Sequence, residues 1–285
     1  MTMKREDMFL EDRHPAVLRG ESLSVSYESR RVFKGLDLSI PEGQITVIVG
    51  PNACGKSSLL RTLSRLLVPE QGQVLLRDRE IHRYGSREVA RILGLLPQSS
   101  SAPAGICVAD LVARGRFPHQ TLLRQWTAAD EQAVAQAMQA TGVHSLADAT
   151  LEELSGGQRQ RVWLAMLLAQ ETPVMLLDEP TTWLDICHQL EVLELCRRLN
   201  REQGRTLVMV LHDLNQAARY ADYLVAMKAG EIVAAGAPER ILTAELVERV
   251  FSIRARIETD PVTGCPWVLP IASVGRMDDG RFLKE

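Results

Sequence analysis

The sequence lacks a hydrophobic run long enough to cross a membrane, because no uninterrupted apolar stretch approaches the roughly 18 residues that a transmembrane helix needs. Residues 1–15 also lack the apolar core of a signal peptide, so we expect the protein to stay in the cytoplasm. The formal net charge of −3 gives no electrostatic case for binding nucleic acid. With 46% hydrophobic and 24% charged residues, the 285-residue chain has the composition of a globular protein with a sizeable core.

The sequence also lacks a cysteine pattern. Its five cysteines are scattered, and no CxxC motif or His/Cys cluster suggests a structural metal. An odd, dispersed set favours reduced thiols over a disulfide framework. The cysteines are Cys54, Cys107, Cys187, Cys196 and Cys265.

One glycine-rich loop organises the chain. Residues 50–57 match the pattern G-x-x-x-x-G-K-[ST] of a phosphate-binding P-loop. The apolar, β-branched residues 44–49 before the loop predict a buried parallel strand, and leucines at helical spacing after it predict a helix that begins near Gly55. A chance glycine-rich turn is the alternative, but strand, loop and helix together favour nucleotide binding. The predicted nucleotide-binding residues of this loop are Gly50, Pro51, Asn52, Ala53, Cys54, Gly55, Lys56, Ser57 and Ser58.

The chemistry of this loop is anion capture. Backbone amides at a helix N-terminus attract phosphate, and Lys56 would reach the β- and γ-phosphates while the Ser57 hydroxyl would bind Mg²⁺. Ala53 stands where a second glycine is common, and we expect an ordinary right-handed conformation there. Cys54, at a helix N-terminus beside Lys56, is expected to be more thiolate-like than a buried cysteine, although a space-filling role in the loop is the favoured interpretation.

Two alternating segments precede the loop, at residues 23–27 and 36–40. Together with the strand at residues 44–49 they predict an antiparallel β layer that flanks the nucleotide site. Tyr27 ends the first segment and has two possible roles. Its ring could stack on adenine, or it could pack on the sheet as an edge-strand tyrosine.

Residues 106–170 are helical in pattern, and we expect a helical lobe inserted into the α/β core. Inside the lobe, Ser155 and Gln158 form a capping box that opens a helix. Gly156 and Gly157 leave the amides at the start of this helix bare, which predicts a second anion site. A well-capped helix without a ligand is the alternative. Because one P-loop satisfies most of a nucleotide's phosphates, the second site would serve a nucleotide held by another copy.

Carboxylates and polar side chains follow the other predicted strands. An apolar strand ends at Asp178 and Glu179, a short strand ends at Gln98, and the strand at residues 206–211 ends at His212. In a parallel α/β sheet these ends line the ligand site. Asp178 would hold hydrated Mg²⁺, with Gln98 a further candidate for Mg²⁺ or a water, Glu179 would orient the attacking water, and His212 would contact the γ-phosphate.

The C-terminal part reads as a hairpin at residues 227–236, a short helix at 243–251, and two strands at 254–258 and 266–271. We expect a flexible segment at residues 1–16, one ATPase domain at 17–250 with its helical lobe at about 99–170, and an extension with a loose tail at 251–285.

This order of motifs resembles the ATP-binding cassette (ABC) ATPases, and the pentapeptide at residues 154–158 is specific to that family. The resemblance covers about residues 18–250. It implies an α/β fold with a P-loop NTPase (RecA-like) core, an N-terminal antiparallel β layer and an inserted α-helical lobe. It also implies that ATP and Mg²⁺ bind between two copies arranged head to tail.

The resemblance further implies roles for single residues. Tyr27 would stack on adenine, and Gln98 would link the nucleotide to the lobe. Asp185 matches the loop that crosses between the two sites of such a dimer. The residues that would contact the γ-phosphate held by the other copy are Ser155, Gly156 and Gly157, next to Gln158.

Residues 113–119, 181–189, 211–222 and 260–270 look like the subunits that power import of iron–siderophore complexes, with the ferric enterobactin type most similar. Haem and cobalamin importers share much of this pattern. The resemblance implies an ATP-hydrolysing subunit on the cytoplasmic face of the inner membrane, with permease partners and, indirectly, a substrate-binding protein. A soluble ABC ATPase and a P-loop kinase are the alternatives, and the kinase would not need residues 154–158.

Overall fold

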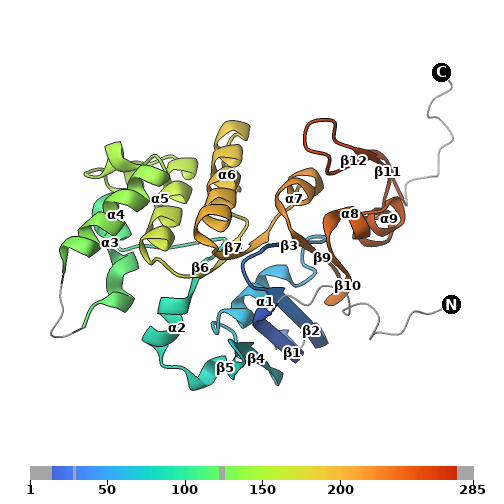
Figure 1. The fold of residues 1–285 in the computed structure, drawn as a ribbon, viewed down its shortest axis with the longest axis horizontal. Coiled ribbons are helices and arrows are strands. Elements are labelled where there is room, and N and C mark those ends of the chain that lie inside the picture. The colour runs from blue at the N-terminus through green and yellow to red at the C-terminus, as the bar shows by residue number, and fades with distance from the viewer. Residues whose placement is uncertain (1–14, 28–29, 122–125, 275–285) are drawn as a thin grey trace.

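The protein is described by a computed structural model, which places residues 15–27, 30–121 and 126–274. The expected loose tail after residue 274 and all but the last two residues of the expected lead-in lie outside these ranges. Figure 1 shows the molecule with β1, β2 and β4 at the bottom, the helices α3–α5 on the left and the C-terminal elements on the right.

A six-stranded sheet forms the centre, in the order β10-β9-β3-β8-β7-β6. The strands β3, β6, β7, β8 and β9 are parallel, and β10 runs antiparallel at one edge. Strands β3, β7 and β8 are buried along their whole length, as their apolar sequences predict. The bounds are β3 Ile45–Val49, β6 Leu93–Leu96, β7 Val174–Asp178, β8 Thr206–Val210, β9 Tyr223–Lys228 and β10 Glu231–Gly236.

A second, antiparallel sheet has the order β2-β1-β4-β5. The predicted antiparallel layer is therefore present, but the strand before the P-loop was wrongly assigned to it, because β3 pairs with β8 and β9 in the central sheet. Strand pairing is a long-range property that the alternation of a short segment does not determine. The bounds are β1 Ala16–Tyr27, β2 Arg30–Pro41, β4 Gln71–Leu76 and β5 Arg79–Glu80.

Helix α1 (Lys56–Leu63) lies between the two sheets (Figure 1). Its buried leucines, Leu59, Leu60 and Leu63, share a core cluster with residues of β1 and β3. The helix that follows the P-loop thus joins the antiparallel layer to the central sheet. A 3₁₀ turn, η2 (Ile81–Arg83), and α2 (Ser86–Ile92) lead from that layer to β6.

Between β6 and β7 the chain is helical, as predicted. Within residues 106–121 and 126–170 the only β pairing is an isolated bridge between Cys107 and Thr150. These helices lie together at the left of Figure 1. The elements are α3 Val108–Ala113, η3 Arg114–His119, α4 Ala128–Ala140, η4 His144–Leu146, η5 Leu151–Glu153 and α5 Gly156–Ala169.

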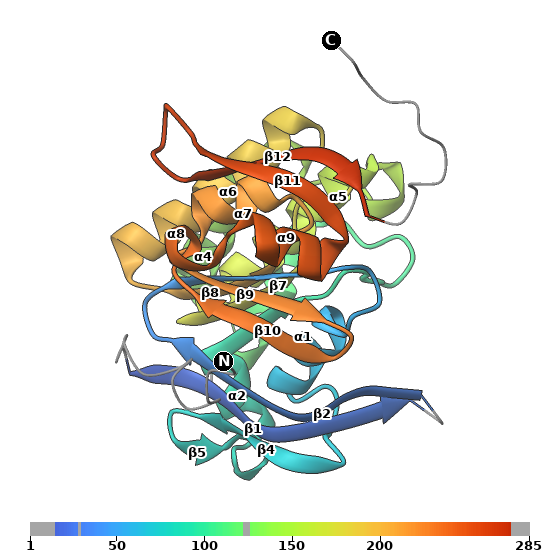
Figure 2. The ribbon, with the colours of Figure 1, turned by 90° about the vertical axis from the view of Figure 1, so that its right-hand side faces the viewer.

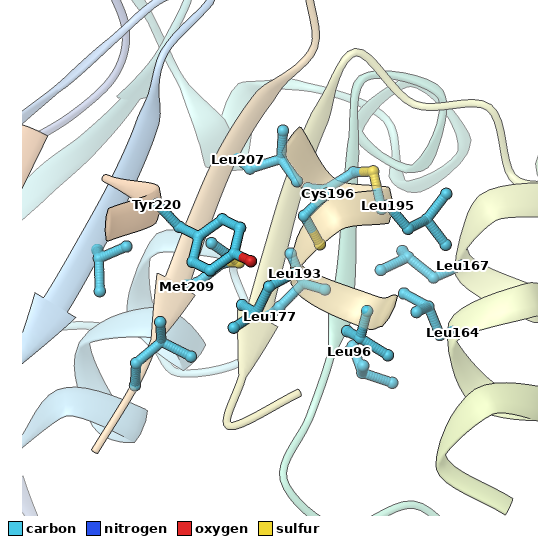
Figure 3. Close-up of a cluster of buried hydrophobic side chains, with 14 of the residues drawn as sticks. Leu96, Leu164, Leu167, Leu177, Leu193, Leu195, Cys196, Leu207, Met209 and Tyr220 are labelled. Carbon is cyan, nitrogen blue, oxygen red and sulfur yellow. The ribbon is translucent and has the colours of Figure 1, made fainter. Parts of the chain in front are cut away.

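The remaining helices follow the central strands. Helix α6 (Ile186–Gln203) packs on the sheet, and α7 (Leu214–Tyr220) follows β8. Figure 3 shows α6 residues such as Leu193 and Cys196 against Leu177, Leu207 and Met209 of the strands, with Leu164 and Leu167 of α5 alongside. The chain ends in α8 (Pro238–Ile241), α9 (Ala244–Phe251) and the hairpin of β11 (Ile253–Thr259) and β12 (Pro266–Ser273).

A buried ion pair holds the helical part together. Arg116 of η3 is 5% exposed and donates from Nε to Asp130 of α4 at 2.8 Å. Its Nη1 donates to the Ala169 carbonyl at 2.7 Å and to Glu171 at 2.6 Å, at the C-terminal end of α5. The Thr127 hydroxyl, with help from Arg116, holds the pKa of Asp130 below its ordinary value. One guanidinium therefore joins η3, α4 and α5.

Replacing Arg116 by alanine should lower the free energy of unfolding by about 3–5 kcal/mol, because it leaves the Asp130 carboxylate buried without its cation. Arg83→Ala is the matched control. It breaks an ion pair with Glu80 in which the arginine side chain is 74% exposed, and should cost at most about 1 kcal/mol. Urea unfolding of both variants measures the difference, and equal losses would contradict it.

Candidate active site

The P-loop connects β3 to α1, as predicted. Gly50 must be glycine here, because a Cβ atom at that position would lie 2.2 Å from the Met227 carbonyl oxygen. Gly55 has a φ of 108° and precedes the first helical residue, Lys56. Lys56 is 5% exposed, and its Nζ donates to the carbonyl oxygens of Gly50 and Pro51 at 2.8 and 2.9 Å. The ammonium group is therefore fixed over the loop.

Two expectations for this loop are wrong. Ala53 has a φ of 59°, so it adopts the left-handed conformation rather than a right-handed one. The closed loop determines this angle, and the surrounding contacts offset a cost of roughly 1–2 kcal/mol for a residue with a Cβ atom. Cys54 is 4% exposed, and burial raises the pKa of its thiol in spite of the nearby Lys56 charge. It fills space in the core instead of presenting a thiolate.

Asp178 is the last residue of β7 and is 2% exposed. Ser57 Oγ donates a hydrogen bond to its Oδ1 at 3.0 Å, so the structure joins two of the three predicted Mg²⁺ ligands. Burial raises the pKa of the Asp178 carboxyl above its ordinary value, outweighing the hydrogen bond from Ser57, which lowers it. Carboxylate, hydroxyl and amide oxygens are hard ligands of the kind that Mg²⁺ prefers, so the residues present fit this ion.

Glu179 is held by three side chains, two of which come from other strand ends and one from the turn after its own strand. His212 Nε2 lies 2.6 Å from its Oε1, Gln98 Nε2 donates to Oε2 at 2.9 Å, and Thr182 Oγ1 donates to the same oxygen at 3.2 Å. Glu179 also has a φ of 54°, which is rare for a residue with a side chain. The contacts around the carboxylate thus stabilise it in a strained position, as is common at functional sites.

Glu179, His212 and Gln98 line one cavity of about 880 Å³ together with the P-loop, whereas Asp178 lies buried behind it. Tyr27 lies at its margin and is 43% exposed. Of the predicted site residues, those that line this cavity are Tyr27, Asn52, Ala53, Gly55, Lys56, Ser57, Ser58, Gln98, Glu179 and His212.

Sequence reasoning missed part of the wall, namely Arg30, Arg31 and Val32 of β2, and Ala229 and Gly230 of the turn between β9 and β10. Gly230 lies in the turn of the hairpin predicted at residues 227–236. A Cβ atom there would lie 2.0 Å from the Val32 carbonyl oxygen, so the turn is packed against β2. Because this contact joins distant segments, the local sequence carried no signal for it beyond the glycine.

The second predicted anion site lies elsewhere on the surface. Ser155 caps α5, donating from its amide to Gln158 Oε1 at 2.9 Å and accepting from the Gln158 amide at 3.2 Å, so the predicted capping box is confirmed. Ser155 and Gly156 are exposed, and neither lines the cavity. Asp185 is also outside it and caps α6 through the His188 amide at 2.9 Å.

Comparison with known proteins decides the family. The sequence model of the ABC transporter family matches residues 33–182. The chain belongs to the ABC transporter family. The predicted resemblance and fold class are thereby confirmed.

Relatives in this family cover nearly the whole chain. The ferric enterobactin transport ATP-binding protein FepC of Escherichia coli is 57% identical over 90% of this chain and 94% of its own. The siderophore transport ATP-binding protein YusV of Bacillus subtilis is 51% identical over 88% of this chain and 91% of its own. The iron(3+)-hydroxamate import ATP-binding protein FhuC of Bacillus subtilis is 46% identical over 87% of this chain and 93% of its own.

Solved structures of ABC proteins share the fold. A metal-chelate type ABC transporter in an inward-facing conformation superposes with a TM-score of 0.76 at 29% identity, over 90% of this chain and 97% of that one. The dimeric ATP-binding cassette MJ0796 bound to ADP and Pi gives a TM-score of 0.69 at 25% identity, over 77% and 98%. This chain is accordingly an ABC-type ATPase that binds ATP. Within the described ranges, no helix is long and apolar enough to cross a membrane.

Asp178→Asn should raise the free energy of unfolding at pH 7 by about 0.5–2 kcal/mol, because it removes a buried charge and keeps a partner for Ser57. A carboxyl whose pKa is higher in the folded than in the unfolded protein destabilises the fold as pH rises through that interval. The gain in free energy of unfolding of the variant over the unmodified protein should therefore become smaller as the pH falls below the ordinary pKa of aspartate. Urea unfolding at pH 4 and pH 7 measures it, and a less stable variant at pH 7 would contradict this account.

Proposed function

We propose that this protein is the ATP-hydrolysing subunit of a transporter that imports an iron–siderophore complex through a partner permease. The observation that carries the ATPase part is the convergence of Lys56, Glu179, His212 and Gln98 on one cavity. The cargo class follows from the names of the relatives, which include ferric enterobactin, siderophore and iron-hydroxamate systems. The protein would lie on the cytoplasmic face of the cell membrane, because its relatives are ATP-binding parts of transport systems.

Nucleotide binding would use both ends of the cavity. The adenine would stack on the half-exposed ring of Tyr27. The phosphates would accept hydrogen bonds from the amides between Asn52 and Ser58, with the Lys56 ammonium placed at the β- and γ-phosphates. Lys56 is already directed over the loop by its two carbonyl contacts.

The residues that would hold Mg²⁺ are Ser57, Asp178 and Gln98, and the ion would supply positive charge beside the transferring phosphoryl group. Asp178 and Ser57 are preorganised for this by their hydrogen bond. The raised pKa of Asp178 also means that a bound cation would convert an unfavourable buried carboxylate into a paired one.

Glu179 would act as the general base. Its carboxylate would accept a hydrogen bond and then a proton from a water molecule, whose oxygen forms the new bond to the γ-phosphorus as the bond to the β–γ bridging oxygen breaks. His212 and Gln98 hold the two oxygens of Glu179, which fixes the direction from which the water is oriented. His212, at the cavity wall, would also contact the γ-phosphate.

The catalytic pocket would be completed by a second copy of the chain. Ser155, Gly156 and Gly157 lie outside the cavity of their own chain and expose the N-terminus of the 14-residue helix α5. A γ-phosphate held by one copy would meet these amides from the other, and Asp185 would lie in the loop that crosses between the sites. The dimeric state of the related MJ0796 cassette supports such an assembly.

The permease would dock on the helical side. A groove of about 520 Å³ lies between α2 and η3, and Phe117 at its edge is 58% exposed. A large apolar side chain at an open groove is typical of a site that binds a partner helix. A substrate-binding protein would act only through the permease.

A mixing experiment tests the shared site. Lys56→Ala removes the phosphate-binding cation, and Ser155→Arg blocks the exposed helix N-terminus, so each purified variant should have ATPase activity at least about 100-fold below that of the unmodified protein. In a head-to-tail dimer, mixing the two variants assembles one intact site, because the unmodified P-loop of one meets the unmodified Ser155 of the other.

The mixture should therefore recover ATPase activity in proportion to the mixed dimers formed. The matched control mixes Lys56→Ala with Glu179→Gln, whose defects lie in the same half-site, and should stay inactive. No recovery in the first mixture would refute the shared site.

Glu179→Gln should keep ATP binding while lowering the hydrolysis rate by about 10²–10⁴-fold, because the amide cannot accept the proton. ATP should then trap a stable dimer, visible by sedimentation. In cells, uptake of iron from a catecholate siderophore should be lost. An unchanged turnover rate would remove Glu179 from the mechanism.

A further inference from the structure

The C-terminal hairpin is fixed beside the active site. β11 and β12 pair along their whole length, and their inner residues Ala255 and Val268 are buried. Asn215 of α7 binds Val268 twice, donating from Nδ2 to its carbonyl at 3.2 Å and accepting from its amide at 2.7 Å. Since α7 begins directly after His212 and Asp213, the hairpin is held next to the cavity wall. Figure 2 shows it at the top, on the opposite side of the molecule from β1 and β2.

The outer face of this hairpin is uncovered and carries large apolar side chains from β12 beside charged side chains from β11. Trp267 and Leu269 alternate along β12 and share one face, and Ile271, the extra residue of a β-bulge, follows them. Their side chains are 41%, 36% and 66% exposed. Three large hydrophobic residues in a row are unusual on the solvent side of an edge hairpin, where natural proteins place charges.

This face continues toward Ser155 through α6. Trp183 lies in the turn before α6, and Ile186 and Leu190 are one helical turn apart on α6; the three residues are 80%, 76% and 38% exposed. Leu190 and Trp267 line the same cavity of about 140 Å³, which joins the helix to the hairpin. At the other end, a Cβ atom on Gly156 would lie 3.6 Å from that of Trp183. We call the continuous surface the hairpin stripe, and its members are Trp183, Ile186, Leu190, Trp267, Leu269 and Ile271.

The charges beside the hairpin stripe are of both signs. Arg254, Arg256 and Glu258 alternate on β11, all exposed, and Arg256 and Glu258 lie opposite Leu269 and Trp267. A two-fold interface brings the same patch of each copy together, so it must be complementary to itself. Arg256 and Glu258 form an ion pair with each other, so most of the charge beside the stripe is balanced within each copy and does not oppose an inverted copy.

We infer that the hairpin stripe is the part of the homodimer interface outside the nucleotide sites, and that it packs against the hairpin stripe of a second copy. The inference rests on the proposed shared site. The amides at Ser155 and Gly156 supply few contacts, whereas a stable interface uses roughly 20–30 residues on each side and an apolar core rich in tryptophan. The hairpin stripe supplies that core and is continuous with Gly156.

The test uses the full chain with Glu179→Gln, in which ATP should hold the dimer. Leu269→Glu with Ile271→Glu places two like charges on the hairpin stripe and should raise the dimer dissociation constant at least tenfold in sedimentation with ATP. The matched control is Leu66→Glu with Val68→Glu, since these side chains are 69% and 68% exposed and lie outside the stripe. ATP binding by the monomer should be unchanged in both.

A second experiment mixes two variant chains and tests whether the hairpin stripe packs against another copy of this chain. A chain with Leu269→Lys and Ile271→Lys should dimerise weakly alone but tightly with the glutamate variant, because opposite charges then face each other. A dissociation constant equal to that of the control, or no rescue in the mixture, would overturn the inference and assign the face to another occupant such as the permease. If the Glu179→Gln parent itself stays monomeric with ATP, this result contradicts the proposed shared active site and, with it, the proposed interface at the hairpin stripe.

Discussion

The parallel pairing of β6, β7, β8 and β3 is the constraint on which the rest of the structure depends. Parallel strands end at the same edge of a sheet, so the residues that follow them meet even though they are far apart in the sequence. Gln98, Glu179 and His212 follow three of these strands, and the P-loop follows the fourth. The hydrogen bonds around Glu179 are thus a direct consequence of the order of strands, and buried apolar side chains on both faces of the sheet keep that order.

Two residues in left-handed conformations and one buried carboxyl lie at this edge. Glu179 and Ala53 have positive φ angles, and Asp178 is a buried carboxyl with a raised pKa. Each lowers stability at a position where the candidate site needs it: Glu179 lines the cavity, Ala53 lies in the P-loop, and Asp178 accepts the hydrogen bond of Ser57. Two sets of buried contacts offset these costs elsewhere. Helix α6 packs on the central sheet, as Figure 3 shows, and α1 packs between the two sheets.

Local patterns predicted the elements well, whereas contacts between distant segments escaped them. The P-loop, the capping box of Ser155 and the strand that ends at Asp178 could be read from spacing because each is specified within a few residues. The partners of β3, the left-handed angle of Ala53 and the burial of Cys54 depend on neighbours from elsewhere in the chain. For the same reason the sequence did not predict that Val32 and Gly230 form part of the cavity wall.

Helix α5 gives a physical route between the proposed shared site and the groove between α2 and η3. Ser155 caps its first turn, and a helix of 14 residues is about 21 Å long. At its far end, Gln170 donates to the Ala90 carbonyl of α2, which lines the groove, and Arg116 binds the carbonyl of Ala169. Because both ends are fixed by hydrogen bonds and Arg116 also joins α4, the helix should move as a rigid unit. A displacement of Ser155 toward a γ-phosphate would then tilt the groove instead of being absorbed within the helical part, so subunit closure and permease movement would be one mechanical event.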